Sequence, residues 1–560
     1  MKIEIKNNHF DKDTWLENMI YDLGVYDIEN FLTLDESVLE KPDLYDNMSD
    51  GLELLKNSIK IGILSDCDVD GATSTTIMYQ YAKKIGKNDI ELFIHDGKQH
   101  GLSEDVFENI KTSDIDLLII PDAGSGDYNE HKILSDIGIK VLVLDHHEAK
   151  KYSIHACVIN NQLSEKVLNK SLSGVGVVYK FLEYCDRHYN VGYKEYIDLV
   201  AFGNISDSMS ILNDETRYLC LEGIKKENLK NRTFKALINK HITEELTMKS
   251  IAWNVTPKIN ALIRVGSMEE KKMLIDSFIN PTKRIEVIKK KIPSKINLST
   301  HIVTISASAK RKQDTMVKKG LVAIEDRIDT SRKTILIKIK DEIPKVATGL
   351  VANKLASKYK LPTIILQPKK ENYFGGSVRS PKNFGGIASF KEYLSNTNKF
   401  ELCEGHPSAF GVEISENNIN QVLDQIDLDF KDTVVNDEDI DYVMDAKSID
   451  NNCIESVGLY EWLWGTDLPE PRFLIKDVEV NSEYINMMFN NTILTFNYDG
   501  IYYNKTFCSR DFKESLGYGC EENIISKIDI IGTFKIETYK GKNYYKVLID
   551  KIIKKERLDE

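Results

Sequence analysis

Five short apolar runs in the first third of the chain constrain its fold most strongly. They occupy residues 60–64, 90–94, 115–120, 140–144 and 156–159. Stretches of helical length and mixed polarity separate the runs, and continuous apolar strands that alternate with helices are typical of a parallel sheet covered on both faces. The sequence therefore predicts an α/β fold. Ligands of such folds bind at the carboxyl ends of the strands.

Acidic residues follow the first run in the pattern Asp66-x-Asp68-x-Asp70-Gly71. A calcium-binding EF-hand loop begins in the same way, but its twelfth position must be a bidentate Glu, and here that position is Ile77. An EF-hand loop also follows a helix, whereas this pattern follows a strand. Three carboxylates at alternate positions after a buried strand predict a site for a hard cation.

Further candidate ligands follow the later runs. The triplet Asp145-His146-His147 directly follows the fourth run, Asp122 follows the third, and Asp207 ends a helical segment rich in small residues. Taken alone, Asp207 would be interpreted as a helix cap. Imidazole nitrogen combined with carboxylate oxygen suits Mn²⁺, and suits Mg²⁺ less well. We therefore predict two divalent cations, Mn²⁺ or alternatively Mg²⁺, in a metal-dependent phosphoesterase, where they activate water and stabilise charge during an in-line phosphoryl displacement.

The charge distribution gives a mixed indication about nucleic acid. The chain has 560 residues and a net charge of −13, which is more acidic than is usual for a nucleic-acid-binding protein. Residues 283–320, however, hold eleven Lys and Arg against Glu286 and Asp314, a local net charge of +9. Such a strip can track a phosphate backbone, and a solvated helix face has the same composition. Both interpretations stay open at this point.

Composition also indicates a compartment. The sequence has no apolar run of the ~18 residues that a membrane span needs, and its first residues lack the apolar core of a signal peptide. Its eight cysteines include no CxxC pair, which fits a reducing environment. We therefore expect a cytoplasmic protein without membrane association, and the abundance of Lys, Asn and Ile suggests a bacterial or phage origin.

Shifts in pattern along the chain predict six segments. The expected order is an N-terminal helical cap at 1–58, a parallel-sheet catalytic domain at 59–265, a helical connector broken at Pro293 over 266–322, a smaller α/β domain at 323–425, an acidic linker at 426–461, and a small antiparallel β-barrel at 462–560.

These motifs resemble those of the DHH phosphoesterases. The first is similar to the family's Asp-x-Asp-x-Asp-Gly, Asp122 to its second motif, Asp145-His146-His147 to its third, and the segment 200–207 to its fourth. Within this superfamily the chain resembles the RecJ family of single-strand-specific exonucleases. This closer resemblance is carried by Pro257-Lys258-Ile259-Asn260-Ala261 with Arg264 and Gly266, by 349–352, by Gly-Ser-Val-Arg-Ser at 376–380, by 405–411, and by 468–473.

The resemblance implies a function and an architecture. The catalytic domain would be a DHH domain, the smaller α/β domain a DHHA1 domain, and the C-terminal barrel an OB-fold. The implied activity is 5′→3′ exonucleolytic degradation of single-stranded DNA by two-metal phosphodiester hydrolysis, in DNA repair or recombination. Single-stranded DNA and a single-strand-binding protein are the implied partners of a monomeric enzyme.

The resemblance also implies roles for individual residues. Metal ligands would be Asp68, Asp70, Asp122, His146 and Asp207, with Asp66 as a further ligand or as a carboxylate that orients one. His147 and Asp145 would be catalytic, His147 by contacting the scissile phosphate. Ser377 and Arg379 would seat a terminal phosphate, and Asn260, Arg264 and His406 would contact the DNA strand.

One segment departs from the RecJ pattern. After the second strand the family has Pro-Asn-Arg and a Gly-Tyr-Gly turn, and the Arg grips the 5′ end. The corresponding segment, 94–102, is shorter and contains no Arg. Lys98 is expected to substitute as a point charge.

Two other functions remain compatible with these motifs. A DHH phosphodiesterase could act on short oligonucleotides or cyclic dinucleotides, although such enzymes are usually short. A non-catalytic DHH replication scaffold would have lost ligands, whereas every ligand position is filled here. The C-terminal segment offers candidate base-stacking aromatics at Phe496, Tyr498, Tyr502, Tyr503, Tyr544 and Tyr545, about a third of which are expected to face a strand.

Overall fold

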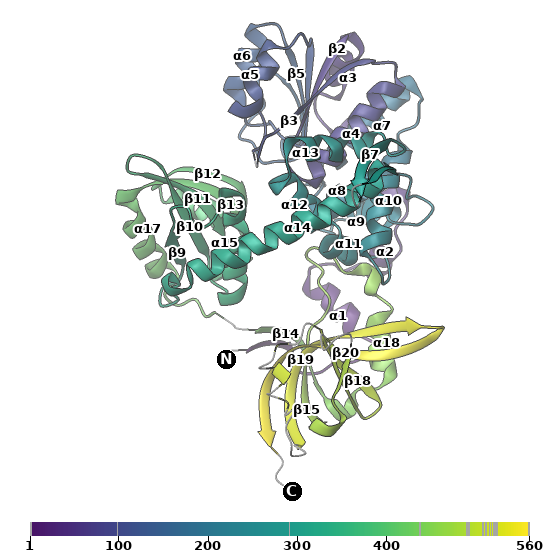
Figure 1. The fold of residues 1–560 in the computed structure, drawn as a ribbon, viewed down its shortest axis with the longest axis vertical. Coiled ribbons are helices and arrows are strands. Elements are labelled where there is room, and N and C mark those ends of the chain that lie inside the picture. The colour runs from purple at the N-terminus through teal and green to yellow at the C-terminus, as the bar shows by residue number, and fades with distance from the viewer. Residues whose placement is uncertain are drawn as a thin grey trace.

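In the computed structural model the chain folds into several lobes (Figure 1). The structure describes residues 3–97, 99–289, 292–435, 438–488, 493–506, 509, 512–513, 516, 518 and 525–557. Lys98 lies outside this set, so its predicted role as a point charge stays a prediction. None of the described helices is both long and apolar enough to cross a membrane.

A five-stranded parallel sheet forms the first α/β lobe, as the apolar runs predict. Its strands are β2 (Lys60–Ser65), β3 (Asp89–Ile94), β4 (Leu117–Pro121), β5 (Lys140–Asp145) and β6 (Cys157–Asn160). The order is β3-β2-β4-β5-β6, and every pairing is parallel. Because the order reverses between β2 and β4, the carboxyl ends of these two strands flank the topological switch point, where open α/β sheets bind ligands.

Alternate side chains of the same strands fill two separate cores. On one face Ile63, Ile119 and Leu144 pack with α3 (Met48–Asn57), α4 (Val69–Lys84) and α7 (Gly174–Tyr189). On the other face Leu118, Ile120 and Val143 pack with α5 (Glu104–Thr112) and α6 (Tyr128–Asp136). Burial on both faces explains why the runs are continuously apolar instead of alternating.

Helices extend the first lobe beyond its sheet. They are α2 (Ile28–Leu32), α8 (Ile197–Ser206), α9 (Asp214–Gly223), α10 (Arg232–His241), α11 (Met248–Asn254), α12 (Thr256–Val265) and α13 (Met268–Ile279). The helix α1 (Trp15–Asp22) instead packs on the C-terminal part of the chain, where Trp15 contacts Tyr460 and Trp464 (Figure 1). The end of α8 and the whole of α12 matter most, because they carry Asp207, Asn260 and Arg264.

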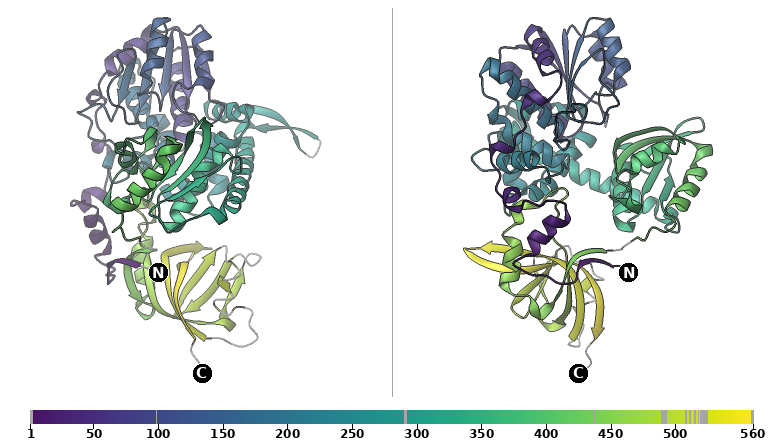
Figure 2. Two further views of the ribbon diagram at one scale, coloured as in Figure 1. Left: turned by 90° about the vertical axis from the view of Figure 1, so that its left-hand side faces the viewer. Right: turned by 180° about the vertical axis from the view of Figure 1, so that it is seen from behind.

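The predicted helical connector over 266–322 is only partly helical. After α13 the chain forms an antiparallel hairpin of β7 (Arg284–Lys289) and β8 (Ile292–Asn297), which projects from the molecule in the left view of Figure 2. The chain then enters the 26-residue helix α14 (Leu298–Ala323). Ile285 and Val287 alternate with polar residues, and this period-2 pattern of β-branched residues favours a strand despite the high lysine content.

The helix α14 leads to a second α/β lobe, as the sequence predicts for 323–425. Its sheet has the order β12-β13-β11-β10-β9, with β9 parallel to β10 and the other pairs antiparallel. Its elements are β9 (Ile335–Lys338), α15 (Lys345–Tyr359), β10 (Thr363–Lys370), β11 (Tyr373–Arg379), α16 (Phe390–Asn396), β12 (Phe400–His406), β13 (Ala409–Ser415) and α17 (Glu416–Asp429).

The C-terminal sheet is mixed, so the expected purely antiparallel arrangement is wrong. Its order is β1-β14-β15-β19-β20-β18-β17-β16, and the pairs β1–β14, β14–β15 and β18–β20 are parallel. Its strands are β1 (Ile3–Asn7), β14 (Glu438–Asp445), β15 (Phe473–Asn481), β16 (Asn486–Met488), β17 (Ile493–Tyr498), β18 (Ile501–Thr506), β19 (Ile525–Tyr539) and β20 (Lys542–Arg557). Its identity as an OB-fold stays a prediction.

Two predicted segments contribute to this sheet unexpectedly. The N-terminal segment, predicted to be helical, opens with β1, which pairs with β14. The segment predicted as an acidic linker supplies β14 and the helix α18 (Asn451–Gly458). Figure 1 accordingly places the N-terminus beside the C-terminal strands, and the C-terminal lobe is assembled from both ends of the chain.

Candidate metal centre

The strand ends at the switch point bring three aspartates together. Asp66 directly follows β2, Asp122 directly follows β4, and Asp145 is the last residue of β5. Asp122 has a left-handed φ of 70°, which Asp tolerates better than most residues. Its N–H donates to the carbonyl oxygen of Leu144 at 2.7 Å, which ties the turn after β4 to β5.

Two more aspartates lie in the first turn of α4 and cap helices. Asp68 caps α4 itself by accepting from the N–H of Gly71 at 3.0 Å. Asp70 is buried and accepts from the Ser173 hydroxyl at 3.0 Å and from the N–H groups of Gly174 and Val175 at 2.7 and 3.1 Å, at the start of α7. Burial, together with the nearby Asp68 carboxylate, raises the pKa of Asp70 to about 6.

Asp145 fixes the orientation of the two histidines that follow it. Its Oδ1 accepts from the N–H groups of His146 and His147 at 2.7 and 3.1 Å and from Nδ1 of His147 at 2.8 Å, while Oδ2 accepts from the N–H of Ser125 at 3.0 Å. Burial alone would raise the pKa of Asp145, but the neighbouring His147 ring holds it below its usual value. The pKa of His147 is raised to about 9, because attraction to Asp145 outweighs the effect of burial.

His146 lies between two carboxylates from opposite sides of the site. Its Nε2 is 3.3 Å from Oδ1 of Asp122 and 3.4 Å from Oδ2 of Asp207, the residue that ends α8. Burial, which disfavours the charged forms, lowers the pKa of His146 and raises the pKa values of Asp122 and Asp207 well above their usual value. The three ligand atoms therefore face one another at a site where both carboxyl groups hold a proton more readily than usual.

The ligand atoms form two neighbouring sets that suit divalent cations. One set is Asp66, Asp68 and Asp122, and the other is Asp70, His146 and Asp207, with the ligand atoms of each set within 4.8 Å of one another. Three carboxylate oxygens of these sets are buried without a hydrogen-bond partner among the described residues: Oδ1 of Asp66, Oδ1 of Asp122 and Oδ2 of Asp207. A buried unpaired carboxylate is costly unless a cation balances it, so these residues fit a metal site.

Glycines keep space open around these carboxylates. A Cβ on Gly174 would lie 2.3 Å from Oδ1 of Asp122, and a Cβ on Gly203 would lie 2.4 Å from Oδ1 of Asp70. Any side chain at either position would displace a candidate ligand.

The second α/β lobe reaches the same site through His406, at the end of β12. Its Nε2 lies 4.0 Å from Oδ1 of Asp207, and its ring centre lies 5.6 Å from that of His147. Burial and the positive charge on His147 lower the pKa of His406 to about 4. The structure thus brings a predicted strand-contacting residue next to the predicted metal ligands.

Two arginines with few partners lie close together between the lobes. Burial and the nearby Arg264 guanidinium lower the pKa of Arg379 to about 10, so the two positive charges interact. Nε of Arg264 and Oδ1 of Asn260 are buried with no hydrogen-bond partner in the described parts of the chain. Ser377, two residues before Arg379 on β11, contacts the Thr348 hydroxyl at 3.0 Å. Like charges in a poorly hydrated site fit an anion such as phosphate.

The sequence pattern missed one residue of the site, His100. Its Nδ1 lies 2.6 Å from Oδ2 of Asp66. The only signal was its position in the segment that departs from the RecJ pattern, and nothing in that segment's composition predicts a partner for a single histidine.

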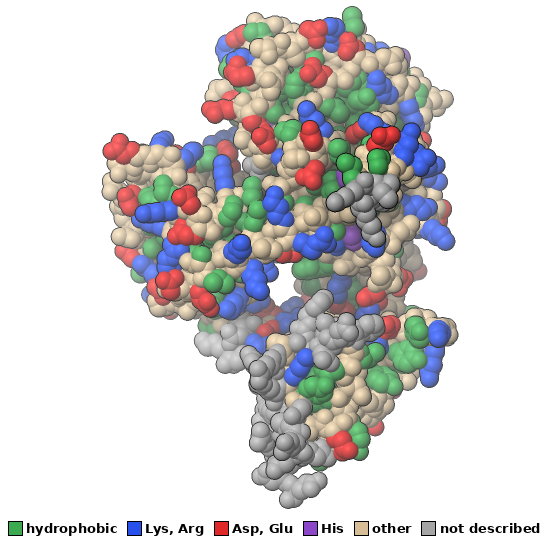
Figure 3. All heavy atoms as spheres, viewed as in Figure 1, with side chains coloured by type: hydrophobic (Ala, Val, Ile, Leu, Met, Phe, Trp, Pro, Cys, Tyr) green, Lys and Arg blue, Asp and Glu red, His purple; other side chains and the backbone are tan. Residues whose placement is uncertain are grey.

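The candidate aromatic track divides into core and surface residues. Phe496 and Tyr503 are buried and stack on each other with ring centres 5.2 Å apart, so they belong to the core of the C-terminal sheet. Tyr502 is 41% exposed and meets Tyr544 edge-on at 6.3 Å. Lysines and arginines gather over α14 in Figure 3. One of the lysines of this helix, Lys310, pairs with Asp314.

Comparison with known proteins agrees with this geometry. The DHH family, N-terminal domain, matches residues 60–204. The YorK protein of the SPbeta prophage in Bacillus subtilis, to which single-strand DNA-specific exonuclease activity is ascribed, is 35% identical over 560 residues that cover 96% of this chain and 95% of YorK. The chain is a RecJ-like member of the DHH family. Similarity to the single-stranded-DNA-specific exonuclease RecJ of Bacillus subtilis is lower, at 24% identity over 90% of this chain and 64% of RecJ.

The RecJ-like chain also shares its fold with solved RecJ structures. RecJ of Thermus thermophilus in complex with Mn²⁺ superposes with a TM-score of 0.73 at 18% identity, over 100% of this chain and 80% of that one. The Mg²⁺ complex of the same protein gives a TM-score of 0.67 at 17% identity, over 99% of this chain and 79% of that one. The acidic cluster of the RecJ-like protein could hold a metal ion.

Proposed function

We propose that this RecJ-like protein is a metal-dependent exonuclease that hydrolyses single-stranded DNA in the 5′→3′ direction and acts in DNA repair or recombination. The observation that carries the proposal is the pair of neighbouring ligand sets at the switch point, with three buried carboxylate oxygens that have no hydrogen-bond partner among the described residues. Divalent cations held there, Mn²⁺ or Mg²⁺, would supply an activated water and charge stabilisation for phosphodiester hydrolysis.

The residues around the ligands have distinct tasks in this proposal. Asp145 holds His147 by its Nδ1, so the opposite nitrogen, Nε2, is left to face the substrate. Because attraction to Asp145 raises the pKa of His147 to about 9, the form with a proton on both ring nitrogens is favoured. It can therefore donate a hydrogen bond from Nε2 to a phosphoryl oxygen as negative charge develops.

The paired arginines suggest how one end of the strand is held. Arg264 and Arg379, with Asn260 and Ser377, would seat the terminal phosphate, and His406 would contact the strand beside the ligands. A seated terminal phosphate sets a fixed distance from the chain end to the cleaved bond, which is what an exonuclease needs. The basic α14 and the exposed Tyr502 are the proposed continuation of the track, and a single-strand-binding protein is the proposed partner of a monomeric enzyme.

One digest tests the proposal. Full-length protein and Mn²⁺ are incubated with single strands labelled at either end, with and without a 5′ phosphate, and with the same strands annealed into duplexes. We expect 5′-labelled strands to release labelled mononucleotides at once, 3′-labelled strands to shorten progressively, and duplexes to resist. Strands that differ only in the 5′ phosphate show whether cleavage requires that phosphate in a chain that lacks the Arg found after the second strand of RecJ proteins.

Two results would contradict the proposal. Cleavage confined to dinucleotides or short oligonucleotides would assign the chain to the DHH phosphodiesterases that act on such substrates. Strand binding without cleavage, unchanged by Asp122→Ala, would indicate a replication scaffold.

A further inference from the structure

His100 lies against a candidate metal ligand from outside the four motifs. It belongs to the loop between β3 and α5, and its Nδ1 lies 2.6 Å from Oδ2 of Asp66. The other ring nitrogen, Nε2, lies 3.9 Å from the thiol of Cys67. The Asp66 side chain is 1% exposed and that of His100 is 50% exposed, so the imidazole covers the carboxylate from the solvent side.

The contact leaves Asp66 with one free oxygen. A carboxylate only accepts hydrogen bonds, so the Nδ1–H of His100 donates and Oδ2 is occupied. Oδ1 is buried without a partner among the described residues, and Asp66 forms a ligand set with Asp68 and Asp122. A carboxylate tied through one oxygen presents the other in a fixed direction, which is how partners of metal ligands commonly act.

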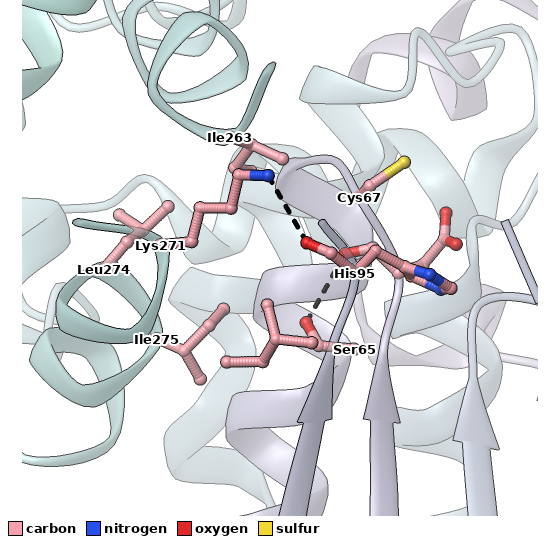
Figure 4. Close-up of a pocket in the computed structure, with 9 residues that line it drawn as sticks. Ser65, Cys67, His95, Ile263, Lys271, Leu274 and Ile275 are labelled. Carbon is pink, nitrogen blue, oxygen red and sulfur yellow. Dashed lines mark hydrogen bonds between the residues drawn. The ribbon is translucent and has the colours of Figure 1, made fainter. Parts of the chain in front are cut away.

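The loop that carries His100 is anchored where it leaves β3. Asp105 accepts from Nδ1 of His95 at 3.0 Å, from the N–H of Asp96 at 2.8 Å and from the Ser103 hydroxyl at 2.7 Å. The buried amine of Lys271 donates to the carbonyl oxygen of His95 at 3.3 Å, and Figure 4 shows this contact beside Cys67. One carboxylate and one amine therefore fix both ends of a short loop.

The residue after His100 is fixed as well. Gly101 has a φ of 60°, and a Cβ there would lie 2.4 Å from Oδ2 of Asp127. The same oxygen accepts from the N–H of Leu102 at 2.7 Å. Glycine suits both the left-handed backbone and the lack of space at this position.

We propose that His100 is a positioning residue that orients Asp66 toward a divalent cation, a role that rests on the proposed metal-dependent function. In this chain the segment 94–102 therefore contributes to the metal centre through the His100 ring, which holds Asp66. In this proposal His100 acts through Asp66, because its Nδ1 is taken up by the Asp66 carboxylate and its Nε2 contacts Cys67.

Binding of Mn²⁺ to the full-length protein, followed by electron paramagnetic resonance of the free ion, tests this role without relying on turnover. We expect His100→Phe, which keeps a ring but loses the donor, to weaken binding at one site about 10-fold or more. His100→Asn, whose amide places an N–H at the Nδ1 position, should stay within about 3-fold of the wild type. His188→Phe on the exposed face of α7 is the matched control.

A double mutant separates positioning from a general structural effect. In an Asp66→Asn background, His100→Phe should cause no further loss, because the partner that it orients is already changed. Additive losses, or wild-type affinity in His100→Phe with an unchanged melting temperature, would overturn the positioning role and leave the proposed function standing. A wild-type protein that binds no Mn²⁺ would overturn both.

Discussion

His147 donates through Nδ1 to Oδ1 of Asp145 over 2.8 Å, and the same carboxylate also accepts from the backbone N–H groups of both histidines in the triplet. Asp145 is fully buried, and N–H donors occupy both of its oxygens. It is therefore close to the ligands while having no free oxygen of its own. This distinguishes Asp145 from Asp122, whose Oδ1 is unpaired among the described residues.

Asp145→Asn should therefore slow strand cleavage while leaving Mn²⁺ affinity nearly intact. The amide cannot accept on both sides, so the His147 ring loses its fixed orientation, and we expect kcat to fall about 100-fold. Asp122→Asn is the contrasting variant, because it should weaken Mn²⁺ binding itself. Single-turnover cleavage and Mn²⁺ titration of both variants check this, and equal loss of Mn²⁺ binding in the two would contradict the distinction.

Metal removal should abolish cleavage and lower stability together. The unpaired carboxylates repel one another without a cation, so we expect chelation to lower the melting temperature and Mn²⁺ or Mg²⁺ to restore both properties. In His146→Ala the activity should fall by orders of magnitude, and the stabilisation by Mn²⁺ should shrink. Scanning calorimetry with and without Mn²⁺ is the measurement. Equal melting temperatures under the two conditions would contradict the proposed metal site.

The two interacting arginines predict an anion effect that needs no catalysis. Inorganic phosphate should raise the melting temperature of the wild type by neutralising Arg264 and Arg379, and this rise should be lost in Arg379→Gln. Arg327→Gln is the matched control, because Arg327 lies on the surface of the same lobe, paired with Glu342. An equal response to phosphate in both variants would show that the effect is unspecific.

A buried ion pair away from the site predicts a large loss of stability. Nζ of Lys180 lies 2.5 Å from Glu215, with the two side chains 1% and 2% exposed. Lys180→Met leaves the Glu215 carboxylate buried without its partner and should lower the free energy of unfolding by about 3 kcal/mol. A second change, Glu215→Gln, should restore at least half of this loss. The exposed pair of Lys194 and Glu36 is the control, and Lys194→Met should cost less than about 1 kcal/mol. Urea unfolding compares the variants.

Asp198 predicts a pH-dependent contribution to stability. Burial raises its pKa to about 6, although it accepts from the N–H groups of Lys230 and Asn231. Because the folded state holds the proton more tightly than the unfolded chain, this group's stabilisation is complete below about pH 4 and is lost as the pH rises through 6. The melting temperature of the wild type relative to Asp198→Asn should therefore fall between pH 4.5 and 7. A constant difference would contradict this.

The fold of the first lobe and the position of its site were predictable because their signals are local. Each apolar run is a strand buried on both faces, and the residues after it, Asp66, Asp122 and Asp145, must meet at one edge of a parallel sheet. In the second α/β lobe only β9, α15 and β10 were predictable in this way, and the antiparallel strands β11, β12 and β13 were not predicted.

The remaining features depend on contacts between distant residues. Asp70 caps α7 through residues more than 100 positions away, and His100 meets Asp66 only because Gly101 turns the loop. Neither contact has a sequence pattern. The β7–β8 hairpin was predicted as helix because its lysines hid the alternation of Ile285 and Val287. The strand β1 is largely exposed and mixes apolar with charged residues, so it lacks the continuous apolar run that marks the buried strands.

The pairing of β1 with β14 has a consequence for how the chain is made. Lys6 bonds to Asp441 across 435 positions of sequence, so β1 is synthesised long before its partner strand leaves the ribosome. An unpaired strand is a template for association with other chains. Glu4 and Lys6 place charge along this one, which should keep the nascent end from joining a neighbour too early.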